Sequence, residues 1–219
     1  MTRAPRSDFR GRHLAAVMLA IAVAGCSPGG DKPTSAAPTP ADAAPEPAPE
    51  PPREGELLLA GAPDGWKVTD AVQTDKLRLA EYGPPDESDG RIERLTLEAQ
   101  KGDPLPDPIN FVLGVSKDLE SRCEGFQDLN VSSGLENGYP TSVELLICGK
   151  FKDSEHGQVM MTKAIQGREK FYVITRRLLT PPMKGQGPPL TAQAMANWTV
   201  ALKHVRVCDT RGDEHPCPP

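Results

Sequence analysis

Apolar and polar residues alternate with the period of a β-strand in several parts of this chain. The clearest case is 91–100, RIERLTLEAQ, where leucine and alanine at every second position alternate with arginine, threonine and glutamate. Such alternation, or a short apolar run between turn residues, predicts half-buried strands. On this basis we expect six strands, at residues 65–72, 76–82, 91–100, 141–148, 158–167 and 169–179.

Two further segments carry apolar residues at helical rather than strand spacing. Residues 105–123 place Phe111, Val115 and Leu119 four positions apart, after an Asp-Pro pair that is typical of a helix start. Residues 190–205 carry a similar stripe of alanine, tryptophan, leucine and valine. The order β-β-β-α-β-β-β-α predicts an α+β domain, with a mainly antiparallel sheet of about six strands covered by two helices in α/β/α layers.

Three short motifs in the folded part resemble those of the PsbP-like/DcrB-like group. They are a P-x-G-W entry at 63–66, the strand pair AIQGREKFYVI at 164–174, and the final helix with its tryptophan. The likeness spans about residues 57–207, and the ending VRVCDTR is similar to that of uncharacterised proteobacterial lipoproteins.

That group includes photosystem II extrinsic subunits and small periplasmic lipoproteins. The resemblance implies a PsbP-like layered fold, and a role in binding or assembling other proteins rather than in catalysis. The two cysteines inside the domain depart from the general pattern of the group, so the resemblance implies no particular partner.

The N-terminus has the plan of a bacterial lipoprotein signal peptide. Four arginines precede the apolar run 14–25, which as a helix would measure about 18 Å, too short for a hydrocarbon core of roughly 30 Å. VAGC, ending at Cys26, resembles the lipobox, in which an aliphatic residue and two small residues precede a lipidated cysteine. The resemblance implies that residues 1–25 are removed and that Cys26 carries the lipid. A plain signal peptide or an uncleaved anchor is the alternative.

A change in composition separates a spacer from a folded domain. Residues 27–54 contain nine prolines and six alanines and lack large apolar side chains, so they cannot bury enough surface to fold. We expect a lipid-anchored, Pro/Ala-rich disordered linker at 26–55, a single domain at 56–207 and a cysteine-bounded tail at 208–219. A Pro-rich ligand for a binding groove is the alternative interpretation of the linker.

The charge of the chain argues against nucleic acid as a partner. Removal of residues 1–25 takes away four arginines and one aspartate, so the net charge changes from −5 to −8. Nucleic-acid binding relies on basic residues that neutralise phosphates, and no basic cluster stands out in the sequence. The same argument disfavours a second, electrostatic contact with anionic lipid. Lys170, Arg176 and Arg177 are interpreted as a solvated strand edge.

Four cysteines remain besides the lipidated one: Cys123, Cys148, Cys208 and Cys217. An exported chain meets an oxidising compartment, so an even number of cysteines predicts disulfides. Three pairings are possible. We favour Cys123–Cys148, which would join the end of the first helix to a strand, and Cys208–Cys217, which would close the tail into a ring.

The sequence carries no recognisable catalytic or metal-binding pattern. It has no C-x-x-C, no G-x-S-x-G elbow and no glycine-rich phosphate loop. The acidic tail with His204 and His215 matches no metal-ligand spacing, and the tripeptide RGD at 211–213 is short enough to arise by chance. We therefore expect no catalytic residue, no cofactor and no metal.

Together these features predict a membrane-anchored periplasmic lipoprotein that binds another envelope protein or assists envelope assembly without catalysis. Ser27 after the lipidated cysteine favours the outer over the inner membrane, by the sorting rule of enterobacterial lipoproteins. Two alternatives stay open. One is a module that binds a small molecule or a metal, between the sheet and the final helix or at the tail, and the other is an enzyme of unrecognised type.

Overall fold

The computed structural model describes residues 55–87, 90–183 and 190–218. All of them belong to Glu50–Pro219, the second of two units into which the chain divides. The predicted signal peptide, Cys26 and nearly all of the predicted linker lie outside the described residues. Among the described helices, none is long and apolar enough to cross a membrane.

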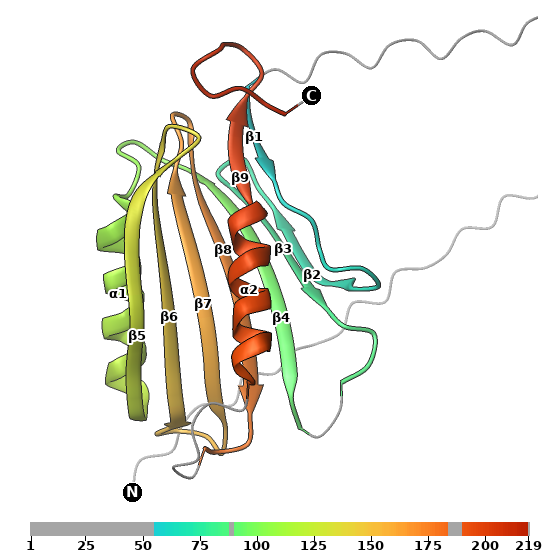
Figure 1. Ribbon diagram of the computed structural model, residues 1–219, viewed down its shortest axis with the longest axis vertical. Coiled ribbons are helices and arrows are strands. Elements are labelled where there is room, and N and C mark those ends of the chain that lie inside the picture. Colours follow the sequence, from blue (N-terminus) through green and yellow to red (C-terminus); the bar gives the residue numbers. More distant parts are fainter. Residues whose placement is uncertain (1–54, 88–89, 184–189, 219) are drawn as a thin grey trace, which may run out of the picture. The chain divides into compact units, whose positions relative to one another are not determined.

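The main sheet has seven strands, and every strand is antiparallel to its neighbours. Figure 1 shows this sheet, in which the order is β2 (Lys67–Gln73), β3 (Leu77–Gly83), β4 (Ile92–Lys101), β8 (Lys170–Thr180), β7 (Gly157–Gln166), β6 (Tyr139–Phe151) and β5 (Cys123–Glu136). The chain crosses from β4 to the far edge through a helix, and the meander from β5 to β8 then returns beside β4. The edges of the sheet are therefore β2 and β5.

A second, two-stranded sheet joins the two ends of the domain. β1 (Glu56–Leu59) pairs antiparallel with β9 (Arg206–Asp209). Glu56 is buried, and its carboxylate accepts the backbone N–H groups of Arg168 and Glu169 in the turn between β7 and β8. The first strand of the domain is thus fixed to the main sheet as well as to β9.

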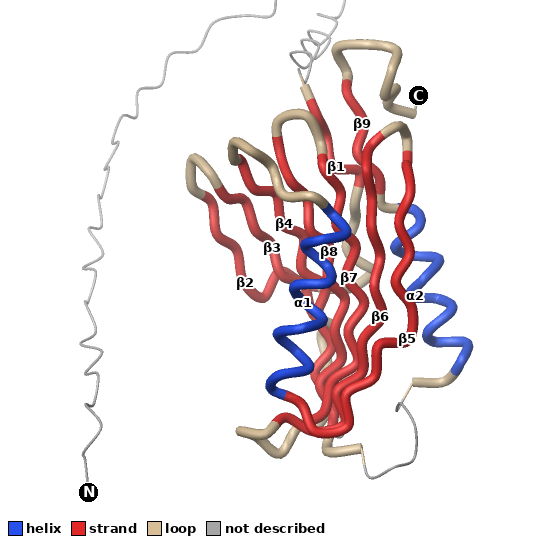
Figure 2. Tube along the Cα trace, turned by 90° about the vertical axis from the view of Figure 1, so that its left-hand side faces the viewer, coloured by secondary structure: helices blue, strands red, loops and turns tan. Residues whose placement is uncertain are grey.

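The two helices cover opposite faces of the main sheet, as Figure 2 shows. α1 (Pro108–Arg122) packs mainly on β5, β6 and β7, and α2 (Ala192–His204) packs on the other face. Strand β8 illustrates the alternation, because Phe171 belongs to the core under α1 and Tyr172 to the core under α2. The larger core lies under α2, where Trp198 and Leu202 are each only 3% exposed.

A buried lysine holds the C-terminal end of α2 on the sheet. Lys163 of β7 is fully buried, and its Nζ donates to the carbonyl oxygens of Leu202 at 2.8 Å and Val205 at 2.7 Å. It also pairs with Glu136 of β5. A cation is favourable at the negative end of a helix dipole. Here it binds the carbonyl of the C-cap residue Val205 and shares the Leu202 carbonyl with the Val205 N–H.

The predicted number and order of strands are wrong. The described residues form nine strands rather than about six, and the missed ones are β1, β5 and β9. The mainly antiparallel sheet and the two helices are as expected. Strand β5 has no apolar alternation, because of its fourteen residues only Cys123 is buried. Strands β1 and β9 span four residues each, too few for a period to be recognised.

Candidate functional site

The structure contains two disulfides, in the pairing that the sequence favours. Cys123, at the junction of α1 and β5, is bonded to Cys148 of β6, with 5.6 Å between their Cα atoms. Cys208 of β9 is bonded to Cys217, with 4.9 Å between their Cα atoms. Cys26 lies outside the described residues, so its lipidation stays a prediction.

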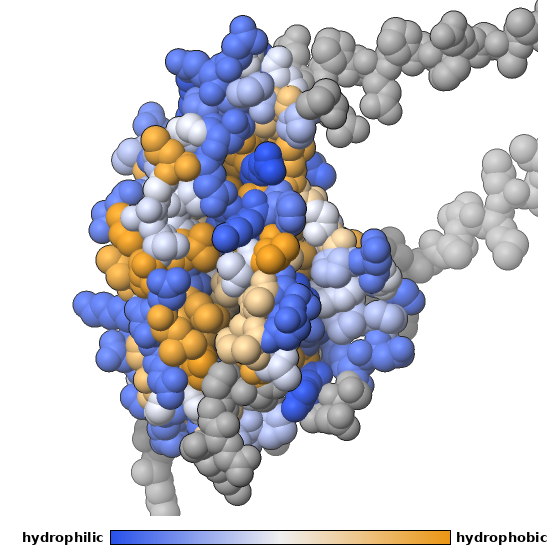
Figure 3. Space-filling model, in the orientation of Figure 1, coloured by the Kyte–Doolittle hydropathy of each residue, from blue (hydrophilic) through white to orange (hydrophobic). Residues whose placement is uncertain are grey.

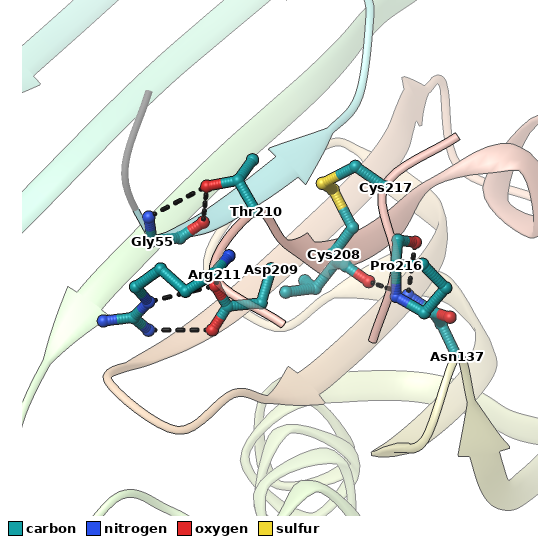
Figure 4. Close-up of a disulfide and its surroundings, with 9 residues drawn as sticks. Gly55, Asn137, Cys208, Asp209, Thr210, Arg211, Pro216 and Cys217 are labelled. Carbon is teal, nitrogen blue, oxygen red and sulfur yellow. Dashed lines mark hydrogen bonds and ion pairs between the residues drawn. A yellow bond between two sulfur atoms is a disulfide. The ribbon is translucent and has the colours of Figure 1, made fainter. Parts of the chain in front are cut away.

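The disulfide ring of the tail docks on the turn between β5 and β6, as Figure 4 shows. The side-chain amide of Asn137 in that turn donates to the carbonyl oxygen of Val207 at 2.9 Å. The ring of His215 stacks on Tyr139, with 4.1 Å between the ring centroids. The tail therefore packs against the domain and closes over the end of the core.

The charged side chains of the tail are engaged in contacts with one another and with the domain. Arg211 pairs with Asp209 at 2.8 Å and with Glu169 at 2.5 Å. The backbone N–H of Gly55 donates to the Thr210 hydroxyl at 3.1 Å, which ties the start of the domain to the tail. Over residues 55–87, 90–183 and 190–218, no three His, Cys, Asp or Glu side chains converge to hold a metal ion.

One face of the main sheet is only half covered by a helix. α1 lies over β5, β6 and β7, and Figure 2 shows β2, β3 and β4 extending beyond it with no helix in front of them. Val72 and Leu79 are direct cross-strand partners. Because Leu79 pairs with Glu98 and Glu98 with Val173, which belongs to the core under α1, both apolar residues face the α1 side.

We call this uncovered surface the open face. Val72 is 40% exposed on it, and Leu79 is half-buried. The residues of the open face are Val72, Leu77, Leu79, Glu81, Arg94 and Arg177. Exposed apolar residues that lie together, with charges around them, are typical of a protein-binding surface.

An ion-pair cluster belongs to the open face. One oxygen of Glu81 lies 3.3 Å from Arg94 Nε, and the other lies 3.0 Å from Arg177 Nη2. Arg94 also pairs with Glu87, and the Thr69 hydroxyl donates to Glu81 at 3.1 Å. A single carboxylate thus positions two guanidinium groups beside the apolar residues.

The interpretation of Lys170, Arg176 and Arg177 as a solvated strand edge is wrong. They belong to β8, the fourth of the seven strands and so the centre of the sheet. Arg177 faces the α1 side. Arg176 faces the opposite side, where its guanidinium carbon lies 4.9 Å from the ring centroid of Trp198 and 5.4 Å from that of Trp66. These cation–π contacts fix Arg176 over the core under α2.

A groove of ≈ 460 Å³ runs between α1 and the open face. Thr96 and Thr175 contribute hydroxyls to it, and Arg122 and Arg177 are among its charged lining residues. Both arginines are already paired with carboxylates, Arg122 with Asp118 and Arg177 with Glu81. The groove therefore presents paired charges, although the Nε of Arg177 is buried without a hydrogen-bond partner among the described residues.

A buried acid lies under α1, at the inner end of a polar row. Glu144 of β6 has no exposed surface. Across the α1 side of the sheet, successive cross-strand partners run from Glu144 through three threonines to the open face, in the order Glu144, Thr162, Thr175, Thr96 and Glu81. The buried carboxyl and the exposed ion-pair cluster thus belong to one continuous line of polar side chains.

Burial raises the pKa of Glu144 to about 7, and the charge of Asp128 adds to the shift. Neither carboxyl oxygen makes a hydrogen bond of regular geometry within the described part of the chain. The Ser116 hydroxyl of α1 is nevertheless near enough to oppose part of the shift. The Thr162 hydroxyl is buried without a partner as well. Unsatisfied buried polar groups are uncommon in folded proteins, so this pair marks the interface under α1 as unusual.

Sequence reasoning missed the open face, Glu144 and Lys163. The open face combines β2, β3, β4 and β8, and no local pattern reports which half of a sheet a helix covers. A signal does exist for the two buried charges. Glu144 interrupts the apolar run SVELLIC, and Lys163 interrupts VMMTKAI, and a charge within such a run is costly unless it is partnered or shifted in pKa.

No family model and no curated protein matches this chain. Among solved structures, the chain is similar to the Ran-binding protein Mog1p of Saccharomyces cerevisiae, at 15% identity, covering 67% of this chain and 82% of that one, with a TM-score of 0.37. It is also similar to LpqN, involved in cell envelope biogenesis of Mycobacterium tuberculosis, at 14% identity, covering 69% and 88%, with a TM-score of 0.34. TM-scores this low assign no family, and the PsbP-like/DcrB-like resemblance stays a prediction.

Proposed function

We propose that this protein is a lipoprotein of the cell envelope, anchored through Cys26, whose domain binds another envelope protein without catalysing a reaction. The observation that carries the binding role is the open face. Its apolar residues lie on β2 and β3, no helix covers them, and an ion-pair cluster borders them.

The geometry of β2 favours binding to an extended segment of the partner protein. β2 is an edge strand, and all seven of its residues are exposed, with Val68 at 58%. A partner strand can add to such an edge through main-chain hydrogen bonds, while its side chains contact Val72 and the cluster around Glu81. The register of β2 shifts between Val68 and Asp70, so added pairing is confined to the stretch after Asp70.

Photo-crosslinking in intact cells tests the binding role. A photoreactive residue is introduced in place of Val72 on the open face or, as a control, in place of Val200, which is 54% exposed on α2. We expect a discrete crosslinked protein from position 72 and none of that mass from position 200. The same products from both positions, or none from position 72, would contradict the proposal.

The anchor and the membrane are proposals that rest on the N-terminal sequence. Cys26→Ala should abolish palmitate labelling and release the protein from membranes, and labelling that survives the substitution would refute the anchor. The serine at position 27 favours the outer membrane, so density-gradient separation of the two membranes should recover the wild-type protein in the outer fraction. Recovery with the inner membrane would overturn that assignment alone.

A further inference from the structure

The side of the sheet that carries α2 holds a groove of ≈ 410 Å³ between β1 and strands β3, β4 and β8. Its apolar lining comes from both walls. Leu58 and Ala60 stand on the β1 side, and Ala80, Leu97 and Ala99 stand on the sheet. Ala80 and Ala99 have small side chains, which leave a hollow where larger ones would fill the space. Figure 3, which views this side, shows hydrophobic surface interspersed with hydrophilic surface.

Four cations occupy neighbouring positions at one end of strands β3, β4 and β8, and two of them line this groove. Arg78 and Lys170 line it. Lys101 is the direct cross-strand partner of Lys170, and its backbone N–H donates to the carbonyl oxygen of Lys76 at 2.7 Å. Side chains two positions apart in a strand lie on the same face of the sheet. By this spacing from residues of the core under α2, that face also carries Arg78, Lys101 and Lys170. We call Lys76, Arg78, Lys101 and Lys170 the cationic rim.

The cationic rim has no acidic partner within the described ranges of the chain. None of the four side chains makes an ion pair or a hydrogen bond there. Glu56 also lines the groove, but its oxygens accept backbone N–H groups from Arg168 and Glu169. Asp75 and Asp103 are close in sequence, and neither is paired with the rim.

Such a cluster is unexpected in this chain. The net charge is −5, and it becomes −8 without residues 1–25. Like charges directly opposite on neighbouring strands are destabilising, as Lys101 and Lys170 are here. Unpaired cations beside an apolar hollow are complementary to a ligand that has an anionic head and an apolar body.

We propose that this groove binds an anionic phospholipid, with an acyl chain against Ala80, Leu97 and Ala99 and the phosphate at the cationic rim. The apolar hollow favours a lipid over an acidic peptide, because a peptide rich in carboxylates gains nothing from burying methyl groups there. The site lies on the face opposite the open face, so it goes beyond the protein-binding role and does not depend on it.

The test uses the full mature chain with Cys26→Ser, since the acyl chains of the anchor would compete for the groove. Calorimetric titration with short-chain phosphatidylglycerol, below its micelle concentration, should give saturable binding. Phosphatidylcholine of equal chain length, inorganic phosphate and a glutamate-rich peptide should each bind at least about tenfold more weakly, as expected for the loss of one charge-assisted or apolar contribution. Equal binding of phosphate or of the peptide would overturn the lipid assignment.

Two kinds of variant locate the site. Lys101→Gln and Lys170→Gln should each weaken phosphatidylglycerol about tenfold, since each removes a charge-assisted contact. Lys117→Gln, on exposed α1 at the opposite face, should leave the affinity unchanged. Ala99→Leu fills the hollow and should weaken the lipid about tenfold without changing the binding of phosphate. Loss of affinity in Lys117→Gln, or full affinity in both rim variants, would refute the site. The rim variants change side chains that are at least partly exposed, so they test the site even if Ala99→Leu misfolds.

Discussion

At the scale of single residues, Glu144 has an unusual environment for a carboxylic acid. It is fully buried between β6 and α1, its pKa is raised to about 7, and its oxygens lack regular hydrogen bonds. Because the folded-state pKa lies above the unfolded value, the folded protein binds the extra proton. The contribution of Glu144 to the free energy of unfolding is fully present below the unfolded pKa of 4.5. It falls as the pH rises toward 7.

Glu144→Gln should therefore stabilise the protein at alkaline pH and not at acid pH. The glutamine stays neutral, so the free energy of unfolding should rise by about 3 kcal/mol at pH 8 and by little at pH 4. Urea unfolding at the two pH values measures this difference. Glu120→Gln, at an exposed position of α1, the helix that covers Glu144, should change stability little at either pH. An equal gain at both pH values for Glu144→Gln would contradict the account.

Lys163 makes the second prediction at this scale. It bonds two carbonyl oxygens at the end of α2 and pairs with Glu136. Lys163→Met would leave these groups without their cation, and the loss of one partner of a buried pair costs about 3 kcal/mol or more. Lys203→Met, on the exposed side of α2, is the control and should cost under about 1 kcal/mol. A thermal unfolding midpoint for Lys163→Met close to that of the control would show that the lysine does not hold the helix.

At the scale of elements, the sequence predicts what has a strong period and misses what lacks one. The six predicted strands and both helices are visible as alternation, as a short apolar run or as a stripe, although β2 buries none of its residues. β5 is an edge strand in which only Cys123 is buried, so nothing in its sequence distinguishes it from a polar loop. The Asn137-Gly138 turn that ends it was the available clue, since such a turn implies a strand on either side.

The disulfides act at the scale of elements. Cys123 and Cys148 are 25 positions apart in the sequence, and Cys208 and Cys217 are 9 apart. In the chain-entropy model, alanine at both members of the first pair should cost about 3.5 kcal/mol, against about 2.6 kcal/mol for the second. Denaturant unfolding of the two double variants gives the order directly. A larger loss from the tail pair would mean that its contacts with Asn137 and Tyr139, rather than ring closure, dominate its contribution.

At the scale of the whole molecule, the fold creates two surfaces that no stretch of sequence announces. The open face combines β2, β3, β4 and β8 on the α1 side. The cationic rim combines Lys76, Arg78, Lys101 and Lys170 on the α2 side. The sequence has no basic cluster in any one window, and this absence argued against a contact with anionic lipid. The fold nevertheless contains a basic cluster, because antiparallel pairing brings together residues that lie far apart in the chain.

The N-terminal anchor and the open face make one joint claim, namely that the domain meets its partner at the membrane. The most direct test is the yield of the photo-crosslinked partner from position 72, compared between the anchored protein and its Cys26→Ala variant in intact cells. We predict a discrete product that is strong for the anchored protein and reduced at least about tenfold for the released one, since tethering raises the effective concentration. A product of equal yield in both, or one that forms equally from position 200, would contradict the account.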